Sequence, residues 1–592
     1  MKKEYDIFIL GATPAGIACG IRAAREGKKV VIANHGRHIG GFMTSGAGGW
    51  EAPYDGTRSP ILTEVQQRIT DHYRKTYGDG SSQHLASIPS SDNRKHMGRR
   101  KVESCVVERI FEEMLTEQQL ISIMRNFDLS KVSRLNESIS SVTLASNEGG
   151  EECEIKAHIY VDCTYEGDLA ALAGVPCRIG RESREEYGEP HAGRIFTRHS
   201  HNDGGKLSWP IDAAEGRLNM RSFSHASEEI ILPESTGEED SCVMAYNCRL
   251  VLCSNPENRV PISRPANYNP DFVRHLPAMS IVRDLPNSKI AWNAGRLIGP
   301  QSAYPEGDWK TREQISRTYL DGILSQLWFL QNDPSVEPKT REYFRNFGLP
   351  KDEFVDNGHL PYEVYVREAR RIVGQYIFTE QDAILKTGEM RTPIHADSIG
   401  MTDWPLDSVA CTSAEMEGRN DGAFFMSISS RPAQIPYRCL LPKNCDNLLV
   451  PVCISASHVG FGAIRLEPVW MQLGEAAGFA AAISIDSGTH PAAIEIPRLK
   501  RRLVEKGFCI SFFNDIDSAS SEAWAAPIQY LGTLGFFDSY DARPRDMLDR
   551  KTMEDWNCRC RKLSPKACSV TGEITRGDAA ILIYEGLNMG NS

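Results

Sequence analysis

The opening of the chain, residues 5–34, is the feature that most constrains its fold. "YDIFIL" is an apolar, strand-like run, "AGIACGIRAAREG" has the spacing of an amphipathic helix ending at Gly27, and "KKVVIAN" indicates a second buried strand. Strand, turn, helix and strand within about 30 residues predict a βαβ unit of the size that binds half of a dinucleotide. We therefore expect an α/β fold with a parallel sheet.

The turn inside this unit departs from the dinucleotide fingerprint G-x-G-x-x-G, because it has the sequence G-A-T-P-A-G. Gly11 permits the tight turn and Gly16 close helix packing, whereas Thr13 stands where a glycine would let backbone approach a pyrophosphate. The Thr13 side chain is compatible with that role if it points away or itself donates to a phosphate oxygen. Pro14 and Ala15 suit the first helical turn, whose N–H groups favour an anion.

The carboxylate expected about 20 residues after the turn is also missing, because Asn34 occupies that position. Its amide can accept a hydrogen bond from a ribose hydroxyl, more weakly than a carboxylate would. Arg37 nearby would instead suit a 2′-phosphate and hence NADP. The spacing alone also leaves open a βα turn with a purely structural role.

Length and composition indicate a soluble chain of several domains. Its 592 residues exceed what one core normally serves, and 41% hydrophobic with 24% charged residues is ordinary. The net charge of −11 gives no reason to expect nucleic acid or an anionic membrane as partner. The start "MKKEYDIFIL" lacks the apolar core of a signal peptide, so we expect a cytoplasmic protein. The cysteines include no CxxC pair, which favours free thiols and no metal site.

The periodicity further along the chain predicts additional elements. We expect helices at about 103–118, 310–331 and 362–377, strands near 120–127, 139–145, 152–163 and 447–453, and a helix over "EPVWMQLGEAAGFAAAISIDSG". The second half of the 362–377 helix would place Arg367, Glu368, Arg370 and Arg371 on a solvated or salt-bridged face, with an anionic substrate as the alternative partner.

Several blocks of sequence point to a known family. "FILGATPAGIACGIRAAREGKKVVIANHGRHIGGFMTSG" resembles the N-terminal signature of the FAD-dependent oxidoreductases that include fumarate reductase flavoproteins. It is more similar to a family of mostly uncharacterised bacterial FAD-dependent oxidoreductases. "YVDCTYEGDLAALAGV" and "NLLVPVCISASHVGFGAIRLEPVWMQLGEAAGFAAA" also match that family, and the resemblance covers about residues 4 to 495. Asn34 and Val409, the latter where the family pattern has a histidine, are departures.

The resemblance implies that FAD is the cofactor and that distant segments assemble its site. The turn after the first strand would take the pyrophosphate, and the loop at 38–46 would run beside the ribityl chain and the flavin. The start of the C-terminal helix and Arg465 would stabilise negative charge on the reduced flavin. The implied contacts are Gly11, Thr13, Pro14, Ala15, Gly16, Asn34, His35, Gly40, Gly41, Met43, Thr44, Cys163, Thr164, Gly462, Arg465 and Glu467.

His458 and Arg465 are the candidate catalytic residues. His458 lies in a small-residue loop between strand and helix, where an imidazole could take a hydroxyl proton while hydride passes to the flavin. The alternative is a histidine that only hydrogen-bonds the backbone of a crowded loop. Arg465 could likewise pair with Glu467 instead of touching flavin or substrate, and Glu166 is a substitute for His458 as base.

The predicted fold is α/β, with a Rossmann-like FAD-binding domain, an inserted substrate domain and a small C-terminal helical module. The FAD-binding domain would comprise residues 1–190 and 411–497, the inserted domain 191–410, and the module 505–592. "FNDIDSASSEAWAAPIQYLGTLGFFDSYDARP" in this module resembles a surface-layer homology domain. We expect the module to serve in packing or oligomerisation, which leaves a homo-oligomer open.

Three functions remain open at this point. The first is an FAD-dependent enzyme that oxidises a secondary alcohol of a small polar substrate such as a carbohydrate or glycoside, with an unknown electron acceptor. The second is a flavin-dependent reductase or desaturase of a C=C bond next to a carbonyl group. The third is a non-enzymatic protein that binds a cell surface through the C-terminal module.

Overall fold

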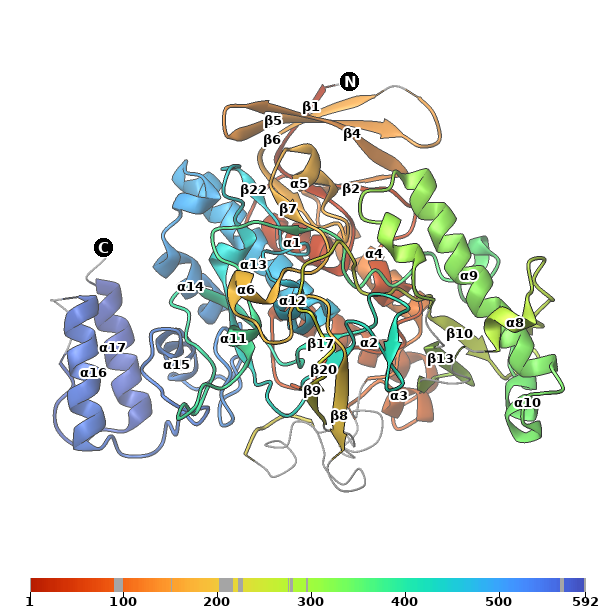
Figure 1. Cartoon of the computed structure of the whole chain (residues 1–592). Helices are drawn as coiled ribbons and strands as arrows, with labels where there is room; N and C mark the ends of the chain where they lie inside the picture. Colours follow the sequence, from red (N-terminus) through yellow and green to blue (C-terminus); the bar gives the residue numbers. More distant parts are fainter. Residues whose placement is uncertain are drawn as a thin grey trace.

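The protein is built on a seven-stranded sheet that lies at the top of Figure 1, in a computed structural model. The structure describes residues 2–89, 100–150, 152–201, 217–221, 227–274, 276, 281–293, 297–564 and 569–589. The strands of the sheet are β1 (Lys2–Leu10), β2 (Val30–Asn34), β3 (Ile121–Arg125), β4 (Phe127–Leu135), β5 (Ser138–Ser146), β6 (Cys153–Asp162) and β22 (Leu448–Leu449). Their order is β3-β2-β1-β6-β5-β4, with β22 beside β6.

The predicted βαβ unit is confirmed. β1 pairs in parallel with β2 and with β6, and helix α1 (Pro14–Arg25) connects β1 to β2. Leu10 lies opposite Ala33 on one side and Asp162 on the other, so the carboxyl ends of three strands meet at one edge. β4 and β5 form an antiparallel extension, and the turn that separates β4 from β3 at Asn126 was not predicted.

Helix α13 (Glu467–Ser487) crosses the back of α1 and is buried from Glu467 to Ser484. Small residues allow this contact, since a Cβ at Gly474 would lie 2.2 Å from the Ala15 carbonyl oxygen. Arg22 of α1 and Glu475 of α13 form a buried ion pair at 2.6 Å. The apolar C-terminal helix that the sequence predicts therefore packs against α1, directly beneath the N-terminal turn.

The middle of the chain supplies a long helix, α9 (Trp309–Asn332), and a three-stranded sheet of β10 (Leu250–Cys253), β13 (Lys289–Asn293) and β12 (Ile281–Leu285). α9 agrees with the predicted helix at 310–331, and α4 (Ser104–Thr116) with that at 103–118.

The predicted helix at 362–377 is wrong. That segment is extended, and its only regular element is β15 (Arg371–Ile372), which pairs with β7 (Cys177–Arg178). Buried Val364 and Val366 alternate with polar residues along the segment, and Arg371 is fully buried. The spacing of the charged residues suggested the polar face of a surface helix. The segment is instead extended and buried on both sides, so that spacing does not report a helical period. Arg367 and Arg371 are buried, and the partly buried Arg370 pairs with Asp168, so these arginines do not form a solvated helix face.

The remaining described elements are short or lie at the periphery. The helices are α2 (Pro60–Tyr77), α3 (Ser82–Ala86), α5 (Asp168–Leu172), α6 (Arg184–Tyr187), α8 (Pro270–Val273), α10 (Pro338–Arg345), α11 (Glu380–Ala383) and α12 (His458–Ile464). The strands are β8 (Thr197–His201), β9 (Ser227–Ile231), β11 (Arg259–Val260), β14 (Leu349–Pro350), β16 (Ser398–Thr402), β17 (Asp407–Ser408), β18 (Glu415–Met416), β19 (Arg419–Asn420), β20 (Phe424–Phe425) and β21 (Ala433–Pro436).

The C-terminal residues form a helical module at the left of Figure 1. It contains α15 (Ala525–Gly532), α16 (Arg550–Leu563) and α17 (Arg576–Met589), preceded by α14 (Ile496–Glu505). Buried polar contacts attach it to the rest of the chain, among them Arg391 Nη2 to Ser511 Oγ at 2.9 Å and Gln434 Nε2 to the Gly532 carbonyl at 3.2 Å. The expected domain boundaries and the surface-layer resemblance stay predictions.

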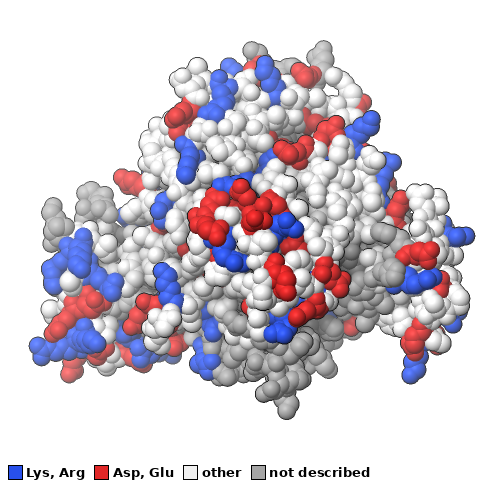
Figure 2. Space-filling view, viewed as in Figure 1, with Lys and Arg blue, Asp and Glu red and all other residues white. Residues whose placement is uncertain are grey.

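Figure 2 shows acidic side chains gathered near the centre of one face, and acidic and basic side chains intermixed over the C-terminal helices at the left. Within the part of the chain that the structure describes, no helix is both long enough and apolar enough to span a bilayer. The expectations about partners and compartment stay predictions.

Candidate functional site

A cavity of about 840 Å³ opens at the carboxyl edge of the central sheet. Gly11 and Thr13 line it from the β1 turn, Asn34 and His35 from the end of β2, and Thr164 from the end of β6. Open α/β sheets bind ligands at this edge, and pockets for cofactors commonly measure 300–1,000 Å³. We call this space the large cavity.

The turn after β1 is shaped by two close approaches. Gly11 has φ +96°, and a Cβ there would lie 2.8 Å from the carbonyl carbon and oxygen of Cys163. A Cβ at Gly16 would lie 2.0 Å from the Gly11 carbonyl oxygen. Both positions therefore need glycine, as the fingerprint predicts.

Thr13 has a structural role that leaves the turn open to a ligand. Its hydroxyl donates to the Cys163 carbonyl oxygen at 2.7 Å and accepts from the Gly16 N–H at 3.3 Å, so it is the N-cap of α1. Pro14 follows as the first helical residue. The Thr13 hydroxyl thus bonds within the protein, and a contact between Thr13 and a phosphate oxygen stays a prediction.

Asn34 ties two loops together at the cavity wall. Its Oδ1 accepts from the Ala12 N–H at 2.9 Å, and its Nδ2 donates to the carbonyl oxygens of Gly36 and His38 at 3.0 and 2.9 Å. The amide thus connects the β1 turn to the loop after β2. A ribose contact by Asn34 stays a prediction. In such a contact, Oδ1 would accept a hydrogen bond from the ribose hydroxyl in addition to the one from the Ala12 N–H.

The predicted contacts in the loop at 38–46 lie behind the turn. Among the described residues, those that line the large cavity do not include Gly40, Gly41, Met43 or Thr44. The Gly40 N–H donates to the Ala12 carbonyl at 2.8 Å, and the Thr44 hydroxyl donates to the Ile39 carbonyl at 2.6 Å. This loop supports the β1 turn, and a direct flavin contact from it stays a prediction.

Three further predicted contacts, Ala15, Cys163 and Gly462, also pack within the protein. Ala15 is buried in the first turn of α1, and Cys163 is fully buried where β6 meets the turn. A Cβ at Gly462, on α12, would lie 2.7 Å from the Asp407 carbonyl oxygen, so this glycine packs against β17.

Two of the carboxyl groups that line the large cavity are Glu166, which is buried, and Glu363, which is half-buried. Glu166 accepts a hydrogen bond from the Tyr304 hydroxyl at 3.1 Å, and burial raises its pKa. Burial, with the nearby Glu166 carboxylate, also raises the pKa of Glu363 to about 7. A carboxyl group poised near neutral pH and facing a cavity is suited to accept or donate a proton.

An aromatic pair borders the exposed part of the cavity. The His35 ring stacks on Trp309 with centroids 3.5 Å apart, which joins the end of β2 to the start of α9. One turn further along α9, Arg312 forms an ion pair with Asp168 at 2.6 Å. The start of α9 therefore lies along one side of the large cavity.

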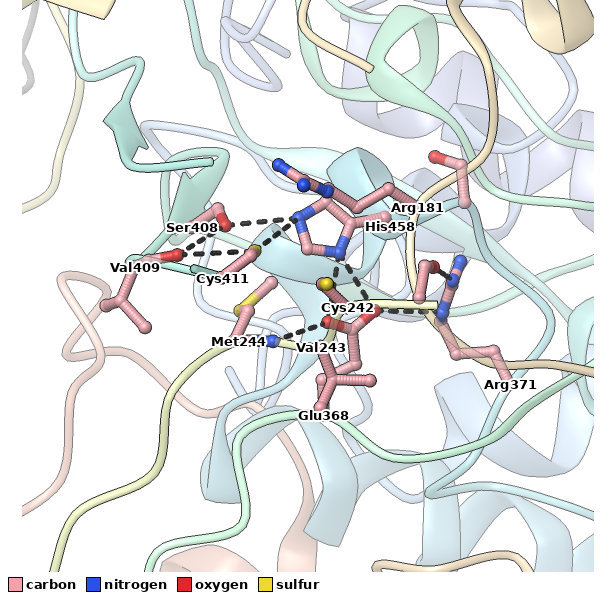
Figure 3. A network of polar contacts seen from close by, with 12 residues as sticks. Arg181, Cys242, Val243, Met244, Glu368, Arg371, Ser408, Val409, Cys411 and His458 are labelled. Atoms are coloured by element: carbon pink, nitrogen blue, oxygen red, sulfur yellow. Dashed lines mark hydrogen bonds and ion pairs between the residues drawn. The ribbon is translucent and has the colours of Figure 1, made fainter. Parts of the chain in front are cut away.

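His458 lies in a buried polar network, shown in Figure 3 between Glu368 on one side and Ser408 with Cys411 on the other. Its Nδ1 is 2.9 Å from Glu368 Oε2, its Nε2 is 3.1 Å from Ser408 Oγ, and the residue is 1% exposed. Arg371 Nε lies 3.0 Å from the same glutamate. Burial lowers the pKa of His458, but the Glu368 carboxylate outweighs it and the pKa is about 10.

Arg465 and Glu467 do not pair with each other. Arg465 Nη2 is 2.6 Å from Asp407 Oδ2 and its Nη1 donates to the Tyr365 hydroxyl at 2.8 Å. Glu467, at the start of α13, accepts from the Tyr165 hydroxyl at 2.7 Å. The pairing considered as an alternative from the sequence is therefore corrected, because the α12–α13 bend directs the two side chains to different partners.

Sequence reasoning missed Glu363 and Glu368 as residues of the site. The helical interpretation of 362–377 hid them, since it placed Glu368 on a solvated face. The alternation of Val364 and Val366 with polar residues was the signal for a buried extended segment.

Comparison with known proteins supports the cofactor. A family model described as FAD dependent oxidoreductase matches residues 6–503. No curated protein matches the chain.

Solved structures give only distant likenesses. A geranylgeranyl bacteriochlorophyll reductase-like protein from Thermoplasma acidophilum is 9% identical over 90% of this chain and 87% of its own, with a TM-score of 0.34. Anhydrotetracycline hydroxylase OxyS from Streptomyces rimosus is 15% identical over 35% of this chain and 43% of its own, with a TM-score of 0.21. The chain thus spans less than half the length of that hydroxylase.

Proposed function

The chain belongs to the FAD-dependent oxidoreductase family, its cofactor is FAD, and on that premise we propose that it oxidises a secondary alcohol of a small polar substrate. The observation that carries the proposal is the large cavity, which opens at the carboxyl ends of β1, β2 and β6 and is lined by Glu363, a carboxyl group whose pKa is raised to about 7.

The residues that line the cavity fit FAD. The Gly11 turn and the N-terminus of α1 offer a close backbone approach and a positive dipole end to the diphosphate. Phe127 and Leu129 line the cavity near Asn34 and provide apolar surface for the adenine. Tyr165, Glu363, Val364 and Val366 would border the flavin, because they line the large cavity.

When bound, FAD supplies the acceptor for a hydride from the substrate carbon. Alcohol oxidation also requires a group that takes the hydroxyl proton, and Glu363 is our candidate for that base. Its support is its place on the cavity wall and a pKa of about 7, at which the carboxylate is substantially available at neutral pH.

His458 stays a second prediction for the same role. Both of its ring nitrogens have protein partners, and a pKa of about 10 keeps the ring protonated at neutral pH. A protonated imidazole cannot accept a proton, so the geometry favours His458 as a group that positions Glu368 and Ser408.

A reductase of a C=C bond next to a carbonyl is the second candidate function. Two guanidinium groups beside Tyr365 favour this function. The guanidinium carbons of Arg249 and Arg367 lie 5.1 and 4.6 Å from the centre of the Tyr365 ring. Such a reaction needs donors for the substrate carbonyl and a proton for carbon.

Anaerobic mixing separates the two candidates. The oxidised protein should lose its visible flavin absorbance with hydroxyl-bearing substrates if it is an alcohol dehydrogenase or oxidase. The chemically reduced protein should regain that absorbance with unsaturated acids if it is a reductase. A protein that bleaches with no member of a broad alcohol panel, and whose reduced form is reoxidised by unsaturated acids, would contradict the alcohol proposal.

A further inference from the structure

A second, much smaller cavity lies beside the buried part of the large one. It measures about 20 Å³ and is lined by residues that include Trp50, Arg249, Tyr365 and Glu467. Tyr165 and the segment 363–366 separate the two spaces: Glu363, Val364 and Val366 line the large cavity, while Tyr365 between them lines the small one. The wall is thus about one side chain thick.

Three residues on this small cavity carry buried polar atoms that have no hydrogen-bond partner. They are Arg249 Nε, Trp50 Nε1 and Glu467 Oε2. Arg249 is 4% and Trp50 7% exposed, so water at the surface does not satisfy them. A buried donor or acceptor without a partner destabilises the fold, and three such atoms on one cavity point to a ligand.

The charge balance specifies the kind of ligand. Arg249 and Arg283 both contact the same carboxylate, Glu51, and the Arg249 contact is long at 3.5 Å. Burial raises the pKa of Glu467 to about 8, so at neutral pH its carboxyl group is largely uncharged and can donate. The neighbouring Arg465 is already paired with Asp407. The cavity therefore has donors and an uncompensated positive charge.

The helix behind the cavity adds to this preference. Glu467 and Pro468 are the first residues of the 21-residue α13, and both line the cavity. The N-terminus of a long helix carries a partial positive charge that attracts anions. The volume accommodates one water-sized atom, which matches a single oxygen.

We propose that the small cavity is an anion subsite that takes one carboxylate oxygen of the substrate, which makes the substrate a small hydroxy acid. The hydroxyl group of this substrate rests on the proposed alcohol oxidation, and its carboxylate rests on the small cavity. With the carboxylate at Arg249, the hydroxyl-bearing carbon reaches Glu363 only when the Tyr365 side chain moves aside, because this segment separates the two cavities.

Binding to the FAD-loaded protein tests the inference without turnover. Glycolate, tartrate and gluconate are compared with their uncharged counterparts ethylene glycol, threitol and sorbitol, by flavin difference spectra and by melting temperature. We expect at least one of the acids to bind saturably and the alcohols to bind at least tenfold more weakly. Equal binding of acids and alcohols, or no binding by any acid, would overturn the inference.

Variants locate the site. Arg249→Gln should weaken acid binding at least tenfold, and Arg249→Lys and Trp50→Phe, which keep charge or shape, should give smaller losses. Arg283 does not line the cavity but shares Glu51 with Arg249, so Arg283→Gln should weaken acid binding through charge alone, and by less than Arg249→Gln, which also removes the donor. Unchanged acid binding in both Arg249→Lys and Trp50→Phe would refute the subsite.

FAD content distinguishes this inference from the proposed function. Each variant should retain FAD at the wild-type ratio. If Arg249→Lys or Trp50→Phe loses FAD, the unpartnered donors serve the cofactor; the subsite is then refuted while the cofactor assignment stands.

Discussion

The Thr13 hydroxyl donates a hydrogen bond to the Cys163 carbonyl oxygen at 2.7 Å, which fastens the end of β6 to the turn after β1. The residue that breaks the dinucleotide fingerprint therefore stabilises the turn. Its oxygen also caps α1, so one side chain serves the helix and the junction of two strands.

Thr13→Val should lower the free energy of unfolding by about 1–3 kcal/mol, because it removes the cap and leaves a buried carbonyl without its donor. Thr13→Ser keeps the hydroxyl and should remain close to wild type. Denaturant titration of the two variants measures the difference. Equal stability of the valine and serine variants would show that the hydrogen bond contributes nothing.

Gly11→Ala should reduce retained FAD at least tenfold, because the new Cβ would collide with the Cys163 carbonyl and the Thr164 nitrogen. Gly27→Ala is the matched control: Gly27 has φ +80°, but nothing lies within 4 Å of its Cβ position. Both variants carry the cost of positive φ, roughly 1–2 kcal/mol, and only Gly11→Ala adds the collision. The FAD-to-protein ratio after gel filtration measures the effect, and equal ratios would contradict it.

Asn34→Asp should weaken FAD binding. Position 34 alone suggests the opposite, since a carboxylate is the usual ribose partner there. In the structure, the Asn34 Nδ2 donates to two carbonyl oxygens, and an aspartate would face both with a negative charge. The dissociation constant for FAD, measured on deflavinated protein, decides between the two outcomes; tighter binding would mean that the loop at 36–38 rearranges around the acid.

The sequence predicts the β1–α1–β2 unit better than it predicts the role of Thr13, for physical reasons. The β1–α1–β2 unit could be predicted because its strand and helix periods are local, and Gly11 and Gly16 report backbone contacts that the turn itself makes. The role of Thr13 could not be assigned, because its acceptor, the Cys163 carbonyl, directly follows β6 and is 150 residues away.

The same limit applies to Glu368 and Arg465. Their partners, His458 and Asp407, come from distant segments that only tertiary packing brings together. Charge spacing along 362–377 predicted a helix, since a sequence does not reveal that both sides of an extended segment are buried. The position of His458 between strand and helix was predictable; its burial was not.

Glu368→Gln should destabilise the protein most at acidic to neutral pH. The pKa of His458 rises from 6.5 to about 10 in the fold, so its protonated form contributes stability fully below pH 6.5 and loses it as the pH approaches 10. The gap in unfolding free energy between wild type and variant should therefore narrow over that range. Denaturant titrations at several pH values measure it, and a gap independent of pH would indicate a neutral histidine.

Glu363→Gln should slow reduction of the flavin by substrate about 10²–10⁴-fold, the usual effect of removing a general base. Because the pKa of Glu363 is raised to about 7, the wild-type rate should rise with pH below 7 and level off above it, whereas the variant should lose this dependence. Anaerobic stopped-flow reduction over pH 5.5–8.5 measures both, with FAD content as the control for cofactor loss. His458→Ala gives the competing result, because if it abolishes the pH dependence and Glu363→Gln does not, the base is His458.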